Sequence, residues 1–312
     1  MSGPVTTIDA PPDAAGASRG APPEVEITLA REAMVGKIRV RRSLPRRERR
    51  TVGAWCFLDH MGPASVTKRA SIDVGPHPHA GLHTVTWLIE DEILHRDSLG
   101  SEQVIRPGQL NLMTAGQGVA HSEEATVGYR SQLYGVQLWV AQAEATRHGP
   151  AAFEDYPELP RIELGRSEAT ILVGTFDGKN SLHALTHRSL AAMPCCTRDL
   201  RSGRSSHRLN TRWWSSRALS SSMPKRLKRA NSRTWARGDR SSRCTRMRRP
   251  AWLLLGGEPF VEPIVMWWNF VARSRAEVDA ATRAWNAQDP RFGSVASPLD
   301  RIPAPSLPEA RP

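Results

Sequence analysis

Two short pairs of metal-capable side chains constrain this chain more than any other part of its sequence. They are His77-Pro-His79 and His121-Ser-Glu123, and each pair has the spacing i, i+2. On an extended strand, residues i and i+2 project from the same face of the sheet. If the two strands are neighbours, three imidazoles and one carboxylate meet, a donor set that suits a divalent transition metal with open coordination positions. The spacing therefore predicts a metal site, and the alternative is a scatter of polar histidines near turns.

The sequence around these pairs is typical of β-structure. Pro78 lacks an N–H group, so it fits an edge strand or a bent strand. Gly116 and Gly118 allow the backbone to approach closely just before His121. Between residues 72 and 142, short strands alternate with turn signals about every eight to twelve residues, which is typical of a sandwich or a barrel.

The same stretches resemble the pirin family of the cupin superfamily. The resemblance covers about residues 25–178 and 251–292. The matching motifs in chain order are Arg41-Arg42-x-Leu44-Pro45, Val52-Gly53, Phe57-Leu58-Asp59-His60-Met61-Gly62-Pro63, His77-Pro78-His79, His95-Arg96-Asp97-Ser98, Pro107-Gly108, Met113-Thr114-Ala115-Gly116, His121-x-Glu123, Gly256-Gly257-Glu258-Pro259 and Trp267-x-Asn269-Phe270.

This resemblance implies an all-β, two-domain (bicupin) fold of double-stranded β-helix or jelly-roll barrels, followed by a short C-terminal helix. It also implies one divalent transition metal, above all Fe(II), in the N-terminal barrel. The ligands that the resemblance implies are His77, His79, His121 and Glu123.

Composition and this resemblance together divide the chain further. We expect a disordered tail over residues 1–22, an N-terminal metal-binding cupin domain over 23–142, a Pro-containing linker over 143–160, a C-terminal cupin-like domain over 161–292 and a Pro-rich tail over 293–312. Residues 273–286 have apolar positions at helical spacing, which predicts a helix. The predicted buried face consists of Val278, Ala281, Thr282 and Trp285.

Residues 181–250 depart from the globular pattern. This stretch has 18 Lys+Arg against two acids, whereas the rest of the chain has 25 against 29, so it carries all of the excess behind the net charge of +12. It contains no Val, Ile, Phe or Tyr, which predicts that it forms no regular sheet and that the second barrel is disrupted. A shifted reading frame between about codons 179 and 250 is favoured, and a basic insertion that binds nucleic acid or a membrane is the alternative.

Other polar residues receive structural interpretations. His83 stands where pirins often carry Glu or Gln; it is a spare ligand, a donor to a ligand or, as we favour, a hydrogen-bonded residue that binds no metal. His60 lacks a partner on its face and is expected to have a structural role. The six arginines of residues 41–50 predict a solvated face, with an anion site as the alternative.

The cysteines Cys56, Cys195, Cys196 and Cys244 have no metal-ligand spacing, and neither a leader peptide nor a membrane span is visible, so a cytoplasmic monomer without disulfides is expected.

Three functions remain open. The first is a quercetin 2,3-dioxygenase-type enzyme that acts on a flavonol-like aromatic substrate, with Glu123 as the general base. The second is a regulatory protein without enzymatic activity that senses metal or redox state and binds a protein partner. The third is a storage or structural cupin, which the four intact ligand types disfavour. No specific nucleic acid and no membrane are expected as partners.

Overall fold

The computed structural model describes residues 29–36, 38–62, 72–129, 133–164, 167–181, 189–196 and 253–308. Strands dominate these residues, which confirms the all-β prediction. In chain order they are β1 Arg31–Val35, β2 Ile38–Leu44, β3 Trp55–Met61, β4 Val74–His79, β5 Leu82–Glu90, β6 Ile93–Asp97, β7 Glu102–Ile105, β8 Leu110–Thr114, β9 Val119–Glu124, β10 Tyr134–Ala141, β11 Ala152–Tyr156, β12 Arg161–Leu164, β13 Ser167–Phe176, β14 Lys179–Ser181, β15 Ser189–Cys196, β16 Leu254–Gly257, β17 Val265–Trp267 and β18 Phe270–Ala272. The helical elements in these ranges are the α-helix α1 Arg275–Asn286 and the 3₁₀-helix η2 Pro290–Phe292.

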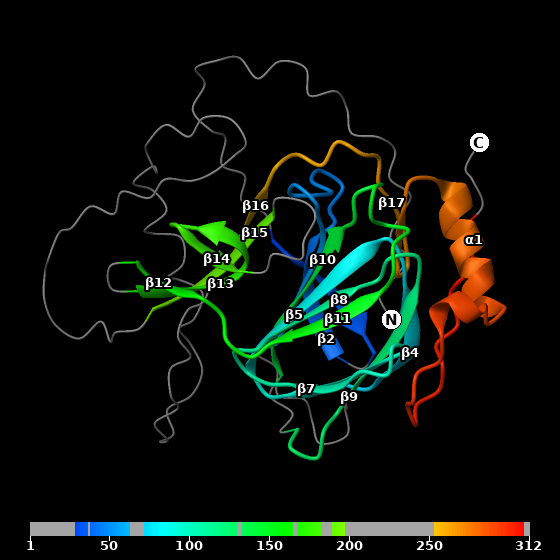
Figure 1. Cartoon of the computed structure of the whole chain (residues 1–312), viewed down its shortest axis with the longest axis horizontal. Coiled ribbons are helices and arrows are strands. Elements are labelled where there is room, and N and C mark those ends of the chain that lie inside the picture. The colour runs from blue at the N-terminus through cyan, green and yellow to red at the C-terminus, as the bar shows by residue number, and fades with distance from the viewer. Residues whose placement is uncertain are drawn as a thin grey trace, which may run out of the picture.

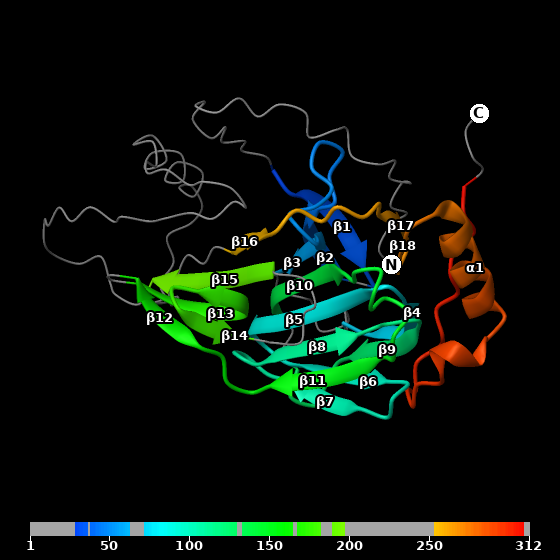
Figure 2. The ribbon, with the colours of Figure 1, turned by 45° about the horizontal axis from the view of Figure 1, so that its top comes forward.

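Two sheets form the N-terminal part of the molecule. A seven-stranded sheet has the order β1-β2-β3-β10-β5-β8-β11, and a four-stranded sheet has the order β4-β9-β6-β7. They face each other as two layers (Figure 2). Each sheet has two edge strands, so the predicted jelly roll is an open sandwich and not a closed barrel. The strand β11 comes from the predicted linker 143–160 and pairs with β8.

The seven-stranded sheet is covered on both faces. On β10, alternate residues Val136, Leu138 and Val140 belong to a core cluster that also contains Leu172 and Val173 of β13. The residues between them point to the four-stranded sheet, because Gln137 donates a hydrogen bond to Glu123 on β9. The period of two along β10 thus separates a packing face from a face that lines the space between the two sheets.

A third, five-stranded sheet corrects one prediction. It has the order β12-β13-β15-β16, with β14 paired to β13, and β15 lies inside the stretch 181–250 that was predicted to form no regular sheet. That prediction is wrong for residues 189–196, because β15 pairs with a strand on each side. Its buried residues Ser189, Ala191 and Ala192 are small, and β13 supplies large apolar groups. Residues 182–188 and 197–252 lie outside the described residues, and the reading-frame interpretation stays a prediction.

The C-terminal segment returns to the N-terminal sheets (Figure 1). Phe270 of β18 forms a parallel bridge with Ala80, and the backbone N–H of Val271 donates to the Ala80 carbonyl at 3.0 Å. The helix α1 begins after the N-cap Ser274, whose hydroxyl accepts from the Glu277 N–H. Its buried residues are Val278, Ala281, Thr282 and Trp285, which confirms the predicted face.

None of the helices within the described ranges has the length and apolar content needed to span a bilayer.

Candidate metal centre

Three histidines meet between the two sheets. His77 and His79 lie on β4, and His121 lies on the neighbouring strand β9, where it is the direct partner of His77. One ring nitrogen of each lies within 4.8 Å of one from each of the others. All three side chains are buried. The i, i+2 spacing on one strand and the antiparallel register with the next strand therefore place the three imidazoles together, as predicted.

Backbone carbonyls fix the proton positions on the two β4 histidines. The Nδ1 atom of His77 lies 2.9 Å from the Gly75 carbonyl oxygen, and that of His79 lies 3.2 Å from the Asn269 carbonyl oxygen. A carbonyl oxygen only accepts, so each Nδ1 carries the proton and donates it. The Nε2 atom of each neutral ring then presents a lone pair. Such outer hydrogen bonds orient metal-binding histidines in proteins.

A chain of side chains fixes His121. Its Nδ1 atom lies 3.3 Å from Nδ1 of His95, and Nε2 of His95 lies 3.1 Å from Oδ2 of Asp97. The carboxylate accepts a proton from His95 Nε2, so Nδ1 of a neutral His95 accepts from His121 Nδ1. Nε2 of His121 is then left with a lone pair.

These assignments bring two lone pairs face to face. Nε2 of His79 lies 3.1 Å from Nε2 of His121, and the hydrogen bonds above leave no proton between them. Two acceptors at this distance repel each other, and a metal ion bound by both would relieve the repulsion. Buried neutral imidazoles with converging lone pairs are a donor set that zinc, copper, iron and nickel accept. The residues present therefore fit a metal ion.

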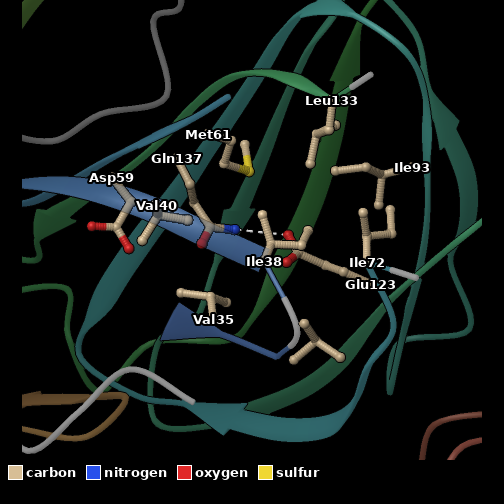
Figure 3. A pocket seen from close by; sticks show the side chains of 11 residues that line it. Val35, Ile38, Val40, Asp59, Met61, Ile72, Ile93, Glu123, Leu133 and Gln137 are labelled. Carbon is tan, nitrogen blue, oxygen red and sulfur yellow. Dashed lines mark hydrogen bonds between the residues drawn. The ribbon is translucent and has the colours of Figure 1, made fainter. Parts of the chain in front are cut away.

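Glu123, the fourth predicted ligand, is not in this histidine group. Its carboxylate accepts a 2.7 Å hydrogen bond from Gln137 across the space between the sheets. Burial raises the pKa of Glu123. It lines a cavity of about 20 Å³ together with Gln137, Asp59 and a ring of aliphatic side chains (Figure 3). The role of Glu123 as a ligand and as the base remains a prediction.

Aromatic side chains of the seven-stranded sheet pack against His79 and His95. The ring of Trp139 meets His79 edge-on with centroids 5.1 Å apart, and Phe153 stacks on His95 with centroids 4.5 Å apart. Sequence reasoning missed these contacts, and it assigned no role to His95, Asp97 or Asn269. The pair His95-Arg-Asp97 has the same i, i+2 spacing as the two pairs of predicted ligands, so it was a usable signal.

The remaining sequence interpretations have mixed outcomes. His83 is buried on β5 outside the cluster and bonds Thr114 Oγ1 at 2.9 Å, and His60 lies 2.9 Å from an Arg41 nitrogen, so both are structural as expected.

The solvated-face interpretation of residues 41–50 is wrong for Arg42, which is 1% exposed. Its guanidinium makes two hydrogen bonds to Asp59, at 2.7 and 2.6 Å, because alternate residues of β2 point inward.

The two facing sheets and the buried histidine cluster define a cupin-type protein with a metal-binding donor set. Family models agree: "Pirin" matches residues 37–140, and "Pirin C-terminal cupin domain" matches residues 225–293. The chain belongs to the pirin family. The second match begins inside the stretch 181–250, earlier than the return of the resemblance at residue 251 that the sequence suggested.

Individual relatives agree with this assignment. A Pseudomonas aeruginosa protein, provisionally named as a quercetin 2,3-dioxygenase, is 39% identical over 292 residues, which cover 88% of this chain and 87% of that protein. A pirin-like protein of Caulobacter vibrioides is 35% identical over 276 residues, 83% of this chain and 91% of that protein. The crystal structure of a quercetin 2,3-dioxygenase from Acinetobacter baumannii superposes with a TM-score of 0.74 at 33% identity, covering 91% of this chain and 96% of that one.

Acidification is expected to destabilise the metal-free protein. Burial lowers the pKa of both His77 and His83 to about 4, and it lowers the pKa of His79 and His121 well below the ordinary value. Below about pH 6.5 the unfolded chain binds protons that the folded chain does not bind, so the free energy of unfolding falls until the folded pKa is reached. At pH 5, His77 and His83 should each contribute about 2 kcal/mol to this loss.

Thermal unfolding in the presence of a chelator at pH 7, 6 and 5 measures the effect. His83→Gln should reduce the loss of stability with falling pH, and substitution of the exposed His148 should not change it. A melting temperature that is constant from pH 7 to pH 5 would contradict the prediction.

Proposed function

We propose that this protein is a metal-dependent dioxygenase of the quercetin 2,3-dioxygenase type, with one Fe(II) ion and a flavonol-like aromatic substrate. The observation that carries the proposal is the pair of Nε2 lone pairs of His79 and His121, 3.1 Å apart and buried, with His77 beside them. The names of the Pseudomonas aeruginosa and Acinetobacter baumannii proteins support the choice of reaction.

His77, His79 and His121 would hold the metal through Nε2, and Glu123 would complete the set. When bound, a divalent metal supplies a Lewis acid that lowers the pKa of a coordinated substrate hydroxyl and allows reaction with O₂. The protein orients the three rings through the Gly75 and Asn269 carbonyls and through His95.

Glu123 would accept a proton from the substrate. It borders both the histidine strands and the aliphatic cavity, and it is the direct strand partner of His95. The raised pKa that burial gives its carboxyl group brings it closer to the working pH, which favours a general base. The Gln137 amide holds the carboxylate at 2.7 Å and limits its motion.

The cavity next to Glu123 provides the apolar environment for an aromatic ring. Its lining is mainly aliphatic, with Ile38, Ile72 and Ile93 around the carboxylate (Figure 3). At about 20 Å³ it has room for about one water molecule, whereas ligand pockets span roughly 300–1,000 Å³. Binding of a flavonol therefore requires the walls of this cavity to move apart.

Metal analysis combined with oxygen uptake tests the proposal. The purified protein is loaded anaerobically with Fe(II), and oxygen consumption is followed with and without quercetin. Bound metal together with quercetin-dependent uptake supports the enzyme. Absence of metal overturns the proposal, as does absence of turnover with quercetin and other flavonols.

The small cavity favours a second candidate function. A protein that binds metal but has little room for a substrate could report the state of the metal to a protein partner, as a regulator. Bound metal without oxygen uptake, together with a change in hydrogen exchange at the surface on metal oxidation, would support this function in place of the first.

Substitution of Glu123 by Gln is expected to separate metal binding from turnover. The three imidazoles remain, so most of the metal should be retained. Loss of the proton acceptor should lower any dioxygenase kcat by about 10²–10⁴-fold. Metal content and oxygen uptake are measured on the same sample, and Glu102→Gln, which neutralises an exposed carboxylate on β7, is the control. A Glu123→Gln protein as fast as its parent would exclude Glu123 as the base.

A further inference from the structure

We propose that His95 and Asp97 are positioning residues that hold His121 in the one tautomer able to bind a metal ion. They do not touch the metal themselves, and they act through the ring of His121. The inference rests on the metal site of the proposed function but not on its dioxygenase activity, because a regulatory or storage protein with the same site would need the same tautomer.

The strand register places the three side chains in line. On β6, Asp97 is the direct partner of His121 on β9, and His95 is the partner of Glu123. The contacts run from Asp97 Oδ2 to His95 Nε2 at 3.1 Å and from His95 Nδ1 to His121 Nδ1 at 3.3 Å. All three residues are at most 3% exposed, so water does not compete for these hydrogen bonds.

The outer end of the chain is firmly fixed. Oδ1 of Asp97 accepts hydrogen bonds from the backbone N–H groups of Leu99 and Ser101, both at 2.9 Å. These bonds hold the carboxylate in its ionised form and leave Oδ2 for His95. The ring of His95 is stacked on Phe153 with 15° between the ring planes. The ring is thus held by a flat contact on its face and by hydrogen bonds at both nitrogens.

This chain distinguishes His121 from the other two histidines. His77 and His79 donate to neutral backbone carbonyls, whereas the chain from His121 ends in a carboxylate. A carboxylate behind an imidazole increases the electron-donating strength of the ring toward a metal. We therefore expect His121 to contribute most to metal affinity.

The hydrogen-bond directions predict an unusual result for Asp97→Asn. The Asn oxygen can keep the two backbone bonds, and its NH₂ group then faces His95 Nε2, which must accept. The His95 proton moves to Nδ1, His121 Nδ1 must accept it, and His121 Nε2 carries a hydrogen instead of a lone pair. One amide in place of a carboxylate would thus reverse every bond in the chain and block one metal ligand, with almost no change in shape.

The test measures the affinity for Zn(II) by competition with a chromophoric chelator, together with the visible absorption spectrum of the Co(II) form. Asp97→Asn should weaken Zn(II) binding by about 10–100-fold or more and alter the Co(II) spectrum. His95→Phe, which keeps a flat ring against Phe153 but has no acceptor for His121 Nδ1, should have a similar effect. Glu102→Gln should have none. Because Zn(II) is redox-inert, the outcome is independent of whether the protein consumes O₂.

A purely structural role gives a different pattern. In that case Asp97→Asn would lower the melting temperature of the metal-free protein while leaving the Zn(II) affinity and the Co(II) spectrum at parental values, and the proposal would be wrong. If Asp97→Asn does not fold, His95→Phe is judged by the same criteria. Failure of both variants to fold would assign the pair to the stability of the core and would also overturn the proposal.

Discussion

Replacement of His121 by Ala is expected to abolish metal retention. The substitution removes one of three converging imidazoles and also the ring that connects the cluster to His95. Changes behind a ligand typically cost about 10–100-fold in metal affinity, so loss of the ligand itself should cost more than about 100-fold. His79→Ala should also weaken metal retention, but less than His121→Ala, because only the chain from His121 ends in a carboxylate. Metal content after dialysis, measured by elemental analysis, is the direct readout.

A thermal shift adds a second measurement. A metal at about 100 times its Kd stabilises the folded state by about 2.7 kcal/mol, so the parent should melt at a higher temperature when metal is added and His121→Ala should not. His83→Ala is the control, because it removes another buried histidine that lies outside the cluster. Parental metal content in both His79→Ala and His121→Ala would show that these histidines do not form the site.

Gly81→Ala is expected to be strongly destabilising and to weaken metal binding from a distance. Gly81 has φ +72°, and a Cβ built on it would lie 2.0 Å from the carbonyl oxygen of Val271. The left-handed backbone alone costs a non-glycine residue about 1–2 kcal/mol. The collision adds to this cost, since it pushes β18 away from Ala80 and disturbs the neighbouring Asn269 carbonyl that orients His79.

Gly108→Ala provides a matched comparison for this effect. Gly108 has φ +86°, but no atom lies within 4 Å of the added Cβ. Its substitution should therefore lower the free energy of unfolding only by the cost of a left-handed backbone at alanine. We expect a loss of about 3 kcal/mol or more for Gly81→Ala, against about 1–2 kcal/mol for Gly108→Ala. Denaturant unfolding and Zn(II) affinity are measured for both variants. Equal stability of the two would mean that the contact between Gly81 and β18 does not form in solution.

The histidine cluster was predictable because it depends on local rules. The spacing of His77 and His79 puts them on one face of a strand, and the strand signals around His121 indicate a second strand. The position of Glu123 follows the same rule only in part. A register irregularity between Val74 and His77 alters the pairing of β4 with β9, and the carboxylate turns to the Gln137 amide on the opposite sheet. The side-chain spacing alone does not encode that choice.

Other features could not be predicted because their cause lies far away in the chain. Asn269 contributes a backbone carbonyl, and any residue type offers the same atom, so no sequence signal marks it. The strand β15 forms in a segment with poor β-propensity because its two neighbouring strands provide partners for its backbone. Arg42 is buried despite five nearby arginines because strand alternation overrides the local charge. In each case the observed structure depends on contacts with distant parts of the chain, which the local sequence does not indicate.

The bond between His79 and the Asn269 carbonyl also sets the time at which the site becomes complete during protein synthesis. These residues are separated by 190 positions in the chain. At about 5–20 residues per second, a ribosome needs roughly 10–40 s to reach the second after it has added the first. During that interval the nascent chain has its histidines but not the carbonyl that fixes the proton on His79. A message that stops within the Arg-rich and Ser-rich stretch would therefore encode all three imidazoles and still yield no finished site.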